Sequence, residues 1–192
     1  MTDSATMPPS SSTQDLDFTT LMRVERSPKA FGSRLVSLVS LPAGSRLCAM
    51  DAATPGRKAY SSVQVSRTQH VELNSDLVYC NHSCAPSLEF DTARREVRVA
   101  RARDLRAGDP LTFFYPSSEW DMAQPFECNC GAGEGVCLGW VCGAKALDEE
   151  VLERYWLNAH IVEMLEERRK GREGMNREKG EAGTENSTEG SA

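Results

Sequence analysis

The sequence predicts a β-rich (α+β) fold of short strands and small sheets, and three observations support this prediction. Between residues 19 and 115 the apolar runs are short and are separated by Gly and Pro, without a run of helical length. A cluster of cysteines follows this region. After Gly143 the apolar residues recur at intervals of three and four, which predicts one amphipathic helix. A chain of 192 residues is long enough for one well-formed core.

The individual strands follow from β-branched and apolar runs bounded by turn residues. Turns are expected at 27–32, 41–44 and 106–110, the last two directly before a strand, and residues 51–58 are expected to form a loop. Residues 91–94 separate two alternating runs and predict a hairpin. Strands are therefore expected at 19–24, 34–39, 46–50, 61–65, 88–90, 97–99 and 111–115.

The apolar periodicity predicts a helix over residues 147–165. In the domain division, the C-terminal helix segment is residues 146–165. Acidic residues 148–150 lie in its first turn, where they complement the helix dipole. Its apolar face is expected to cover one side of the core, and the alternative is a surface that docks a partner. That face contains Leu147, Val151, Leu152, Tyr155, Trp156, Ala159 and Val162.

The two ends differ from the rest in composition. Residues 1–17 are polar and are expected to form a disordered arm, and the charged residues 166–192 are expected to form a disordered tail. The net charge of −6 argues against direct nucleic-acid binding. No apolar run has membrane-spanning length, and no secretory signal is expected at the start. We therefore expect an intracellular protein, in the nucleus or the cytoplasm.

The cysteines favour a metal site over disulfides. Cys128 and Cys130 are one residue apart, and Cys137 follows a glycine-rich loop that lets the backbone turn back. Neighbouring cysteines on an extended chain point apart, so that one cation between them is easier to form than a disulfide. A closed structural zinc site needs four ligands. From the residues alone, the fourth ligand is Cys142, Cys80 or Cys84.

Two further segments contain residues that suit a functional site. One is Asn81-His82-Ser83-Cys84-Ala85-Pro86, and the other is the aromatic strand that ends at Tyr115. Taken alone, each has a structural interpretation: a turn with a hydrogen-bonded histidine, and a tyrosine at the end of a core strand. No hydrolase constellation or phosphate-binding loop accompanies them.

Taken together, residues 19–145 resemble the SET-domain protein lysine methyltransferases that carry a post-SET segment. Residues 81–86 are similar to the family's Asn-His-Ser-Cys-x-Pro motif, and residues 103–115 to its signature of a Gly turn followed by a strand ending in the catalytic tyrosine. Residues 126–131 and 137–139 are similar to the post-SET zinc loop. The resemblance implies a SET-type fold with a catalytic core at 18–116 and a zinc-binding post-SET segment at 117–145.

The resemblance also implies site residues. One structural zinc would be held by Cys84, Cys128, Cys130 and Cys137, with Cys142 as the rival of Cys84. Tyr115 would be the catalytic residue, orienting a neutral lysine amine toward the methyl group of S-adenosylmethionine. Cofactor binding would fall to Phe31, Gly32, Ser33, Asn81, His82, Tyr115, Phe126, Trp140 and Val141.

The implied activity is transfer of methyl groups to a lysine of a protein or peptide, with histones among the candidate substrates. Some family positions differ here: Ala30 replaces a glycine, Ser87 an asparagine, Phe114 an acid and Pro110 a glutamate. The segment between Met50 and Asn81, where larger relatives build one wall of the peptide groove, is short. Two alternatives follow: a SET-like binding or scaffold protein without turnover, and a methyltransferase for a non-histone or small-molecule acceptor.

Overall fold

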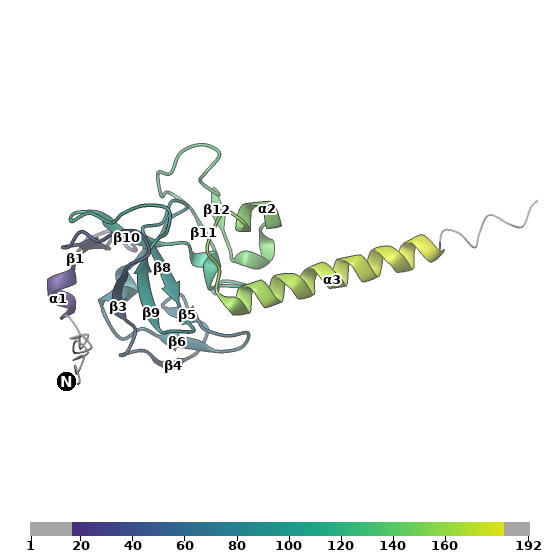
Figure 1. Ribbon diagram of the computed structural model, residues 1–192, viewed down its shortest axis with the longest axis horizontal. Coiled ribbons are helices and arrows are strands. Elements are labelled where there is room, and N and C mark those ends of the chain that lie inside the picture. Colours follow the sequence, from purple (N-terminus) through teal and green to yellow (C-terminus); the bar gives the residue numbers. More distant parts are fainter. Residues whose placement is uncertain (1–16, 183–192) are drawn as a thin grey trace, which may run out of the picture.

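The computed structural model describes residues 17–182, with side chains up to residue 174, and it confirms a β-rich fold of short strands. The strands form three sheets that curl around one another (Figure 1). A long C-terminal helix extends away from them. The predicted arm at 1–17, apart from Asp17, and residues 183–192 of the predicted tail lie outside the described residues.

The largest sheet contains the strand that leads to Tyr115. The central strand β10 (Pro110–Phe113) pairs antiparallel with β2 and parallel with both β7 and β8. Its partner β7 (Asn81–His82) sets Thr112 opposite Asn81 and Phe113 opposite His82. The sheet thus brings the Asn-His motif beside Tyr115. Its remaining strands are β1 (Met22–Glu25), β2 (Arg34–Ser37), β3 (Arg46–Ala49), β8 (Leu88–Asp91) and β9 (Glu96–Val99).

Two smaller sheets lie beside it. One has the order β4 (Thr54–Gly56), β6 (His70–Glu72), β5 (Ser62–Gln64), and the other pairs β11 (Phe126–Glu127) with β12 (Trp140–Val141). Three short 3-10 turns complete the domain: η1 (Asp76–Tyr79), η2 (Tyr115–Ser117) and η3 (Ala144–Ala146).

Apolar side chains form two cores. The larger core joins the main sheet to the three-stranded sheet and includes the fully buried Leu35, Phe90 and Leu111. The smaller one joins Phe114 to Leu152 and Ile161 of the C-terminal segment. The predicted hairpin at 88–99 is confirmed as the antiparallel pair β8–β9, whose turn is closed by the Arg94 N–H donating to Asp91 Oδ1 at 3.0 Å.

Several details of the strand prediction are wrong. Residues 19–24 do not form one strand: α1 (Phe18–Leu21) precedes β1, because the Asp17 carboxylate accepts the N–H of Thr19 at 3.1 Å and caps a helical turn. The expected loop at 51–58 contains β4, and β6 was not expected. The strand predicted to end at Tyr115 ends at Phe113.

The C-terminal helix differs most from the prediction. Residues 147–165 are not one helix: α2 (Glu149–Leu152) ends early, and α3 runs over Ala159–Ala182. The break follows from the buried Asn158, whose Nδ2 donates to the carbonyls of Phe90 and Ser117 and whose Oδ1 accepts from Thr92. A side chain satisfied in this way fixes the chain to the β8–β9 hairpin and interrupts the helix.

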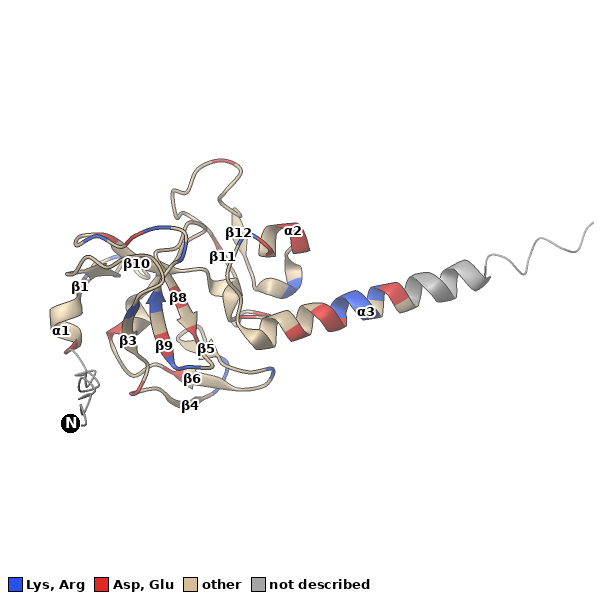
Figure 2. Cartoon of the chain, in the orientation of Figure 1, with Lys and Arg blue, Asp and Glu red and all other residues tan. Residues whose placement is uncertain are grey.

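The tail predicted from residue 166 is helical up to Ala182, where a disordered segment was expected. Residues 166–174 of this helix are largely exposed, and an acidic block is followed along it by a basic block (Figure 2). The expectation of solvent exposure therefore holds for these residues, while that of disorder does not. Within the described residues, no helix combines the length and apolar character that crossing a membrane requires.

Candidate active site and metal centre

Four cysteines from separate parts of the chain converge in space. The sulfur atoms of Cys84, Cys128, Cys130 and Cys137 all lie within 4.8 Å of one another, and Cys84 Sγ is 3.9 Å from Cys128 Sγ. Cys84 follows β7, whereas the other three lie between β11 and β12. The structure thus brings together the ligand set that the resemblance implied, and the rival Cys142 is not part of the group.

Backbone hydrogen bonds shape this cluster. The N–H of Cys128 donates to the carbonyl of Gly139 at 2.7 Å, and the N–H of Cys137 to that of Gly133 at 3.0 Å. Both glycines have a positive φ, 70° and 89°, which a residue with a side chain rarely adopts. The N–H of Leu138 donates to Cys84 Sγ at 3.3 Å, an interaction that favours the thiolate.

The spacing and the donors suit one zinc ion. Tetrahedral Zn²⁺ with bonds of about 2.3 Å places its sulfur ligands about 3.8 Å apart, close to the distance between Cys84 and Cys128. Burial raises the pKa of Cys84 to about 11. Burial acts the same way on Cys130, but hydrogen bonds from the backbone of Cys84 and Ala132 outweigh it and lower the pKa to about 7. Four adjacent thiolates repel one another, and a divalent cation would compensate that repulsion.

His82 connects the sulfur cluster to Tyr115. The backbone N–H of Tyr115 donates to His82 Nδ1 at 3.2 Å, so the ring proton is on Nε2. That Nε2 lies 3.3 Å from Cys84 Sγ, where it donates to the sulfur. Burial lowers the pKa of His82 to about 4, which keeps the ring neutral at pH 7.

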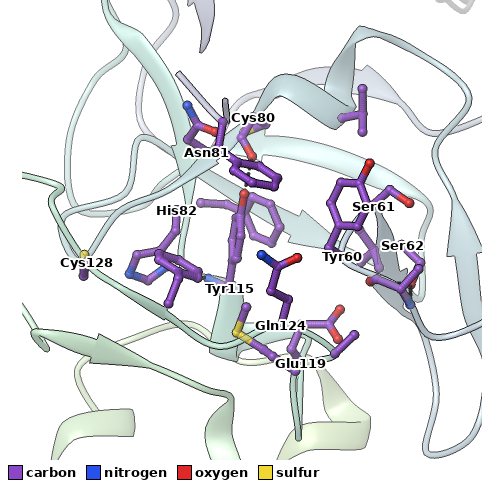
Figure 3. A pocket seen from close by; sticks show the side chains of 18 of the residues that line it. Tyr60, Ser61, Ser62, Cys80, Asn81, His82, Tyr115, Glu119, Gln124 and Cys128 are labelled. Atoms are coloured by element: carbon purple, nitrogen blue, oxygen red, sulfur yellow. Dashed lines mark hydrogen bonds between the residues drawn. The ribbon is translucent and has the colours of Figure 1, made fainter. Parts of the chain in front are cut away.

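A cavity of about 460 Å³ lies beside this connection (Figure 3). Its wall contains six of the nine predicted cofactor residues, from four separate regions of the chain. The β7–β10 register described above brings Asn81 and His82 beside Tyr115. These six are Phe31, Gly32, Asn81, His82, Tyr115 and Phe126.

Tyr115 is held in a defined orientation inside the cavity. Its hydroxyl donates to the carbonyl of Cys80 at 3.1 Å, and its ring packs against His82 and Phe113 with centroids 5.3 and 4.7 Å apart. Burial, and to a smaller extent the nearby Cys80, raises the pKa of Tyr115 far above its usual range. The phenol therefore remains protonated at neutral pH and acts as a hydrogen-bond donor.

Three predicted cofactor residues do not line the cavity. The carbonyl of Ser33 accepts from Asn81 Nδ2 at 2.9 Å, so Ser33 supports the site through its backbone. Trp140 on β12 is 56 % exposed and pairs with Glu127 of the wall, but does not itself line the cavity. Val141 is fully buried opposite Phe126 and offers no surface to a ligand.

The wall also includes residues that the sequence did not indicate, notably Tyr60, Glu119 and Gln124 (Figure 3). Tyr60 is 71 % exposed and meets Phe31 edge-to-face with centroids 5.9 Å apart. Glu119 lies one turn after Tyr115, and its N–H donates to the Tyr115 carbonyl at 3.0 Å. The position of Glu119, four residues after the predicted catalytic tyrosine, was the sequence feature that could have indicated its place in the site.

Glu119 is a buried acid within this wall. Its Oε1 accepts the N–H of Gln64 on β5 at 2.6 Å, while Gln64 Oε1 accepts the N–H of Trp120 at 2.9 Å. Burial raises the pKa of Glu119 to about 7. These two hydrogen bonds hold the segment after Tyr115 against the three-stranded sheet.

Two departures from the family pattern have structural explanations. Phe114, in place of an acid, stacks on Tyr155 with centroids 3.6 Å apart and planes 3° from parallel. Tyr155 in turn donates to the carbonyl of Cys84 at 2.8 Å, which ties the C-terminal segment to the cysteine cluster. Ser87, in place of an asparagine, donates to the Pro110 carbonyl at 2.8 Å.

Comparison with known proteins identifies the family. The methyltransferase flvH of Aspergillus flavus is 55 % identical over 130 residues, which cover 67 % of this chain and 72 % of flvH. The chain belongs to the flvH methyltransferase family. This finding confirms the methyltransferase part of the resemblance. No family model matches the chain, so membership of the SET family stays a prediction.

The chain is also similar to solved structures. KRYPTONITE in complex with mCHG DNA and SAH is similar with a TM-score of 0.46 and 22 % sequence identity. The match covers 62 % of this chain and 28 % of the KRYPTONITE chain.

Proposed function

We propose that this flvH-family methyltransferase is a SET-type enzyme that uses S-adenosylmethionine to methylate the side-chain amine of a lysine in a protein or peptide. One observation carries the proposal: Asn81, His82 and Tyr115 share a cavity wall with Phe31 and Gly32, directly beside the cysteine cluster. These residues come from separate regions of the chain, and the resemblance assigns all of them to one site.

The chain's own groups supply binding and orientation. S-adenosylmethionine, when bound, brings a methyl group that its positively charged sulfur already activates. The Tyr115 hydroxyl and the Cys80 carbonyl, 3.1 Å apart, form a polar pair that orients donor and acceptor beside the rings of Phe113 and Phe126. Phe113 and Phe126 exclude water there, which disfavours a charged lysine and promotes its neutral, nucleophilic form.

The proposal includes one structural zinc on Cys84, Cys128, Cys130 and Cys137. The ion would fix the β11–β12 segment against β7, and this segment carries Phe126 into the cavity wall. Through Nε2 of His82, the same centre supports the backbone of Tyr115. Zinc would therefore act on the active site through positioning.

The test is methyl transfer from labelled S-adenosylmethionine to proteins of an extract and to lysine peptides. Tyr115→Phe removes only the hydroxyl, and the rate should fall about a hundredfold or more while cofactor binding is retained. Tyr60→Phe, which removes a hydroxyl from an exposed residue of the same cavity, is the matched control and should remain active. Undiminished transfer by Tyr115→Phe would contradict the assignment, and cofactor binding without transfer to any acceptor would favour a binding protein.

A further inference from the structure

The cavity contains a buried acid with no role in the chemistry described above. Two acids line its wall, Glu119 and Glu127, and only Glu119 is buried, with 8 % of its surface exposed. Placing a carboxylate in such a site is costly unless a cation or several hydrogen bonds compensate it.

The protein compensates Glu119 only in part. Its Oε1 accepts one backbone N–H, and among the described residues Oε2 has no hydrogen-bond donor. His70 Nε2 lies 3.8 Å from Oε2, beyond hydrogen-bonding distance, and burial lowers the pKa of His70, so this ring is neutral at pH 7. Lys58 is also near Glu119, but its Nζ pairs with Asp121 Oδ2 at 3.0 Å.

Glu119 is also separated from the hydroxyl of Tyr115. In Figure 3 that hydroxyl points toward Cys80, while Glu119 lies toward the other end of the Tyr115 ring, beside Gln124. Asn81 and His82, the proposed cofactor residues, lie on the far side of Tyr115 from Glu119. Glu119 therefore lines the cavity wall at a point away from the Tyr115 hydroxyl, where it can meet a part of the acceptor other than its reacting nitrogen.

We propose that Glu119 binds a second positively charged group of the acceptor, distinct from the nitrogen that is methylated. This inference rests on the proposed function and narrows its substrate class to amines that carry two cationic groups. For a lysine, the second charge is its own free α-ammonium group or the side chain of a neighbouring basic residue.

The ionisation of Glu119 gives this recognition a pH dependence. Burial raises the pKa of Glu119 to about 7, so the carboxylate charge is present above pH 7 and is lost as the pH falls. The other titratable and charged groups that face it are His70, Lys58 and Tyr115. Preference for an acceptor whose second charge is a guanidinium, which stays protonated over this range, should therefore strengthen as pH rises from 6 to 8.

The experiment compares acceptors that differ in one charge, using the full chain and labelled S-adenosylmethionine. The first pair is lysine amide and Nα-acetyl-lysine amide. The second pair is two acetylated lysine peptides that carry Arg or Gln beside the lysine. In one of the two pairs, the wild-type enzyme should show a kcat/KM at least about tenfold higher for the acceptor with the additional positive charge. The pair that shows this difference identifies which second cationic group Glu119 binds.

Glu119→Gln keeps the hydrogen bond to Gln64 and removes the charge, so it should abolish the preference by raising KM for the doubly charged acceptor. Glu127→Gln, on the exposed part of the wall, is the matched control and should keep the preference. Glu119→Asp retains the charge and should keep a reduced preference, which also tests the idea if Glu119→Gln does not fold.

Two results would overturn this inference and leave the proposed function standing. One is methyl transfer by the wild type without any preference, and the other is a preference in Glu119→Gln as large as that of the wild type. Equal use of both acceptors by Glu119→Asp would also overturn it. Absence of transfer to every acceptor would overturn both.

Discussion

Replacement of Glu119 by Gln should stabilise the fold at alkaline pH. Folding raises the pKa of this acid from 4.5 to about 7, chiefly because burial penalises the charged form. The folded state therefore holds its proton more tightly than the unfolded state. The contribution of Glu119 to stability is full below pH 4.5 and is lost as pH rises through about 7.

The magnitude follows from the size of the shift. A difference of this size corresponds to about 3 kcal/mol of unfolding free energy, or about 6–12 °C in Tm for a domain of this length. Residues that serve function often lower the stability of the fold, and a buried carboxylate in a ligand cavity is such a case.

The assay is thermal and urea unfolding of wild type and Glu119→Gln at pH 5 and pH 8.5. Comparison at equal pH cancels the titration of other groups. The variant should gain little at pH 5 and about 3 kcal/mol at pH 8.5, while Glu127→Gln, a change at an exposed acid, should show no such difference. An equal effect at both pH values would refute the reasoning, because it would mean that Glu119 does not titrate differently in the folded state.

Three further predictions test other parts of the molecule. Cys128→Ser should reduce bound zinc from one equivalent to none by metal analysis and lower Tm, whereas Cys142→Ser should retain the metal; a metal-free, fully stable wild type would contradict the zinc proposal. Tyr155→Phe keeps its ring but loses the hydrogen bond to the Cys84 carbonyl, and urea unfolding should show a loss of about 1 kcal/mol. Leu35→Ala, at a fully buried core position, should lower the unfolding free energy by about 2–5 kcal/mol. A smaller effect would mean that the core around residue 35 repacks.

The sequence predicted most of the strands because their signals are local. The runs around Leu35 and Leu47 and the hairpin at 88–99 combine apolar alternation with turn residues at both ends. β4 and β6 were missed because Pro55 and Gly56 are typical turn residues, and His70–Glu72 is a short run with mixed polarity. Both strands are stabilised by pairing with each other, which no local pattern reveals.

The C-terminal segment was mispredicted for a tertiary reason. Its apolar spacing continues through residues 153–158, so periodicity alone favours one helix. The hydrogen bonds of Asn158 to the β8–β9 hairpin and to Ser117 override that preference. The partners lie more than 40 residues away along the chain, and the sequence pattern contains no sign of them.

The candidate site was predictable where motifs exist. The cysteines and Tyr115 were found from spacing and resemblance, and the structure places four sulfurs within 4.8 Å. Glu119 and Tyr60 were not found, because each is a single residue without a motif that reaches the cavity through tertiary packing. Val141 was assigned to the cofactor by the resemblance, yet it pairs with Phe126 and is fully buried.

Calorimetric titration of the purified, metal-loaded chain with S-adenosylmethionine tests the central claim most directly. The account predicts saturable binding of one equivalent, competition by SAH and clear weakening in Asn81→Ala, since Asn81 lines the cavity and fixes the Ser33 carbonyl. Absence of detectable binding by a folded, zinc-containing sample would contradict the account.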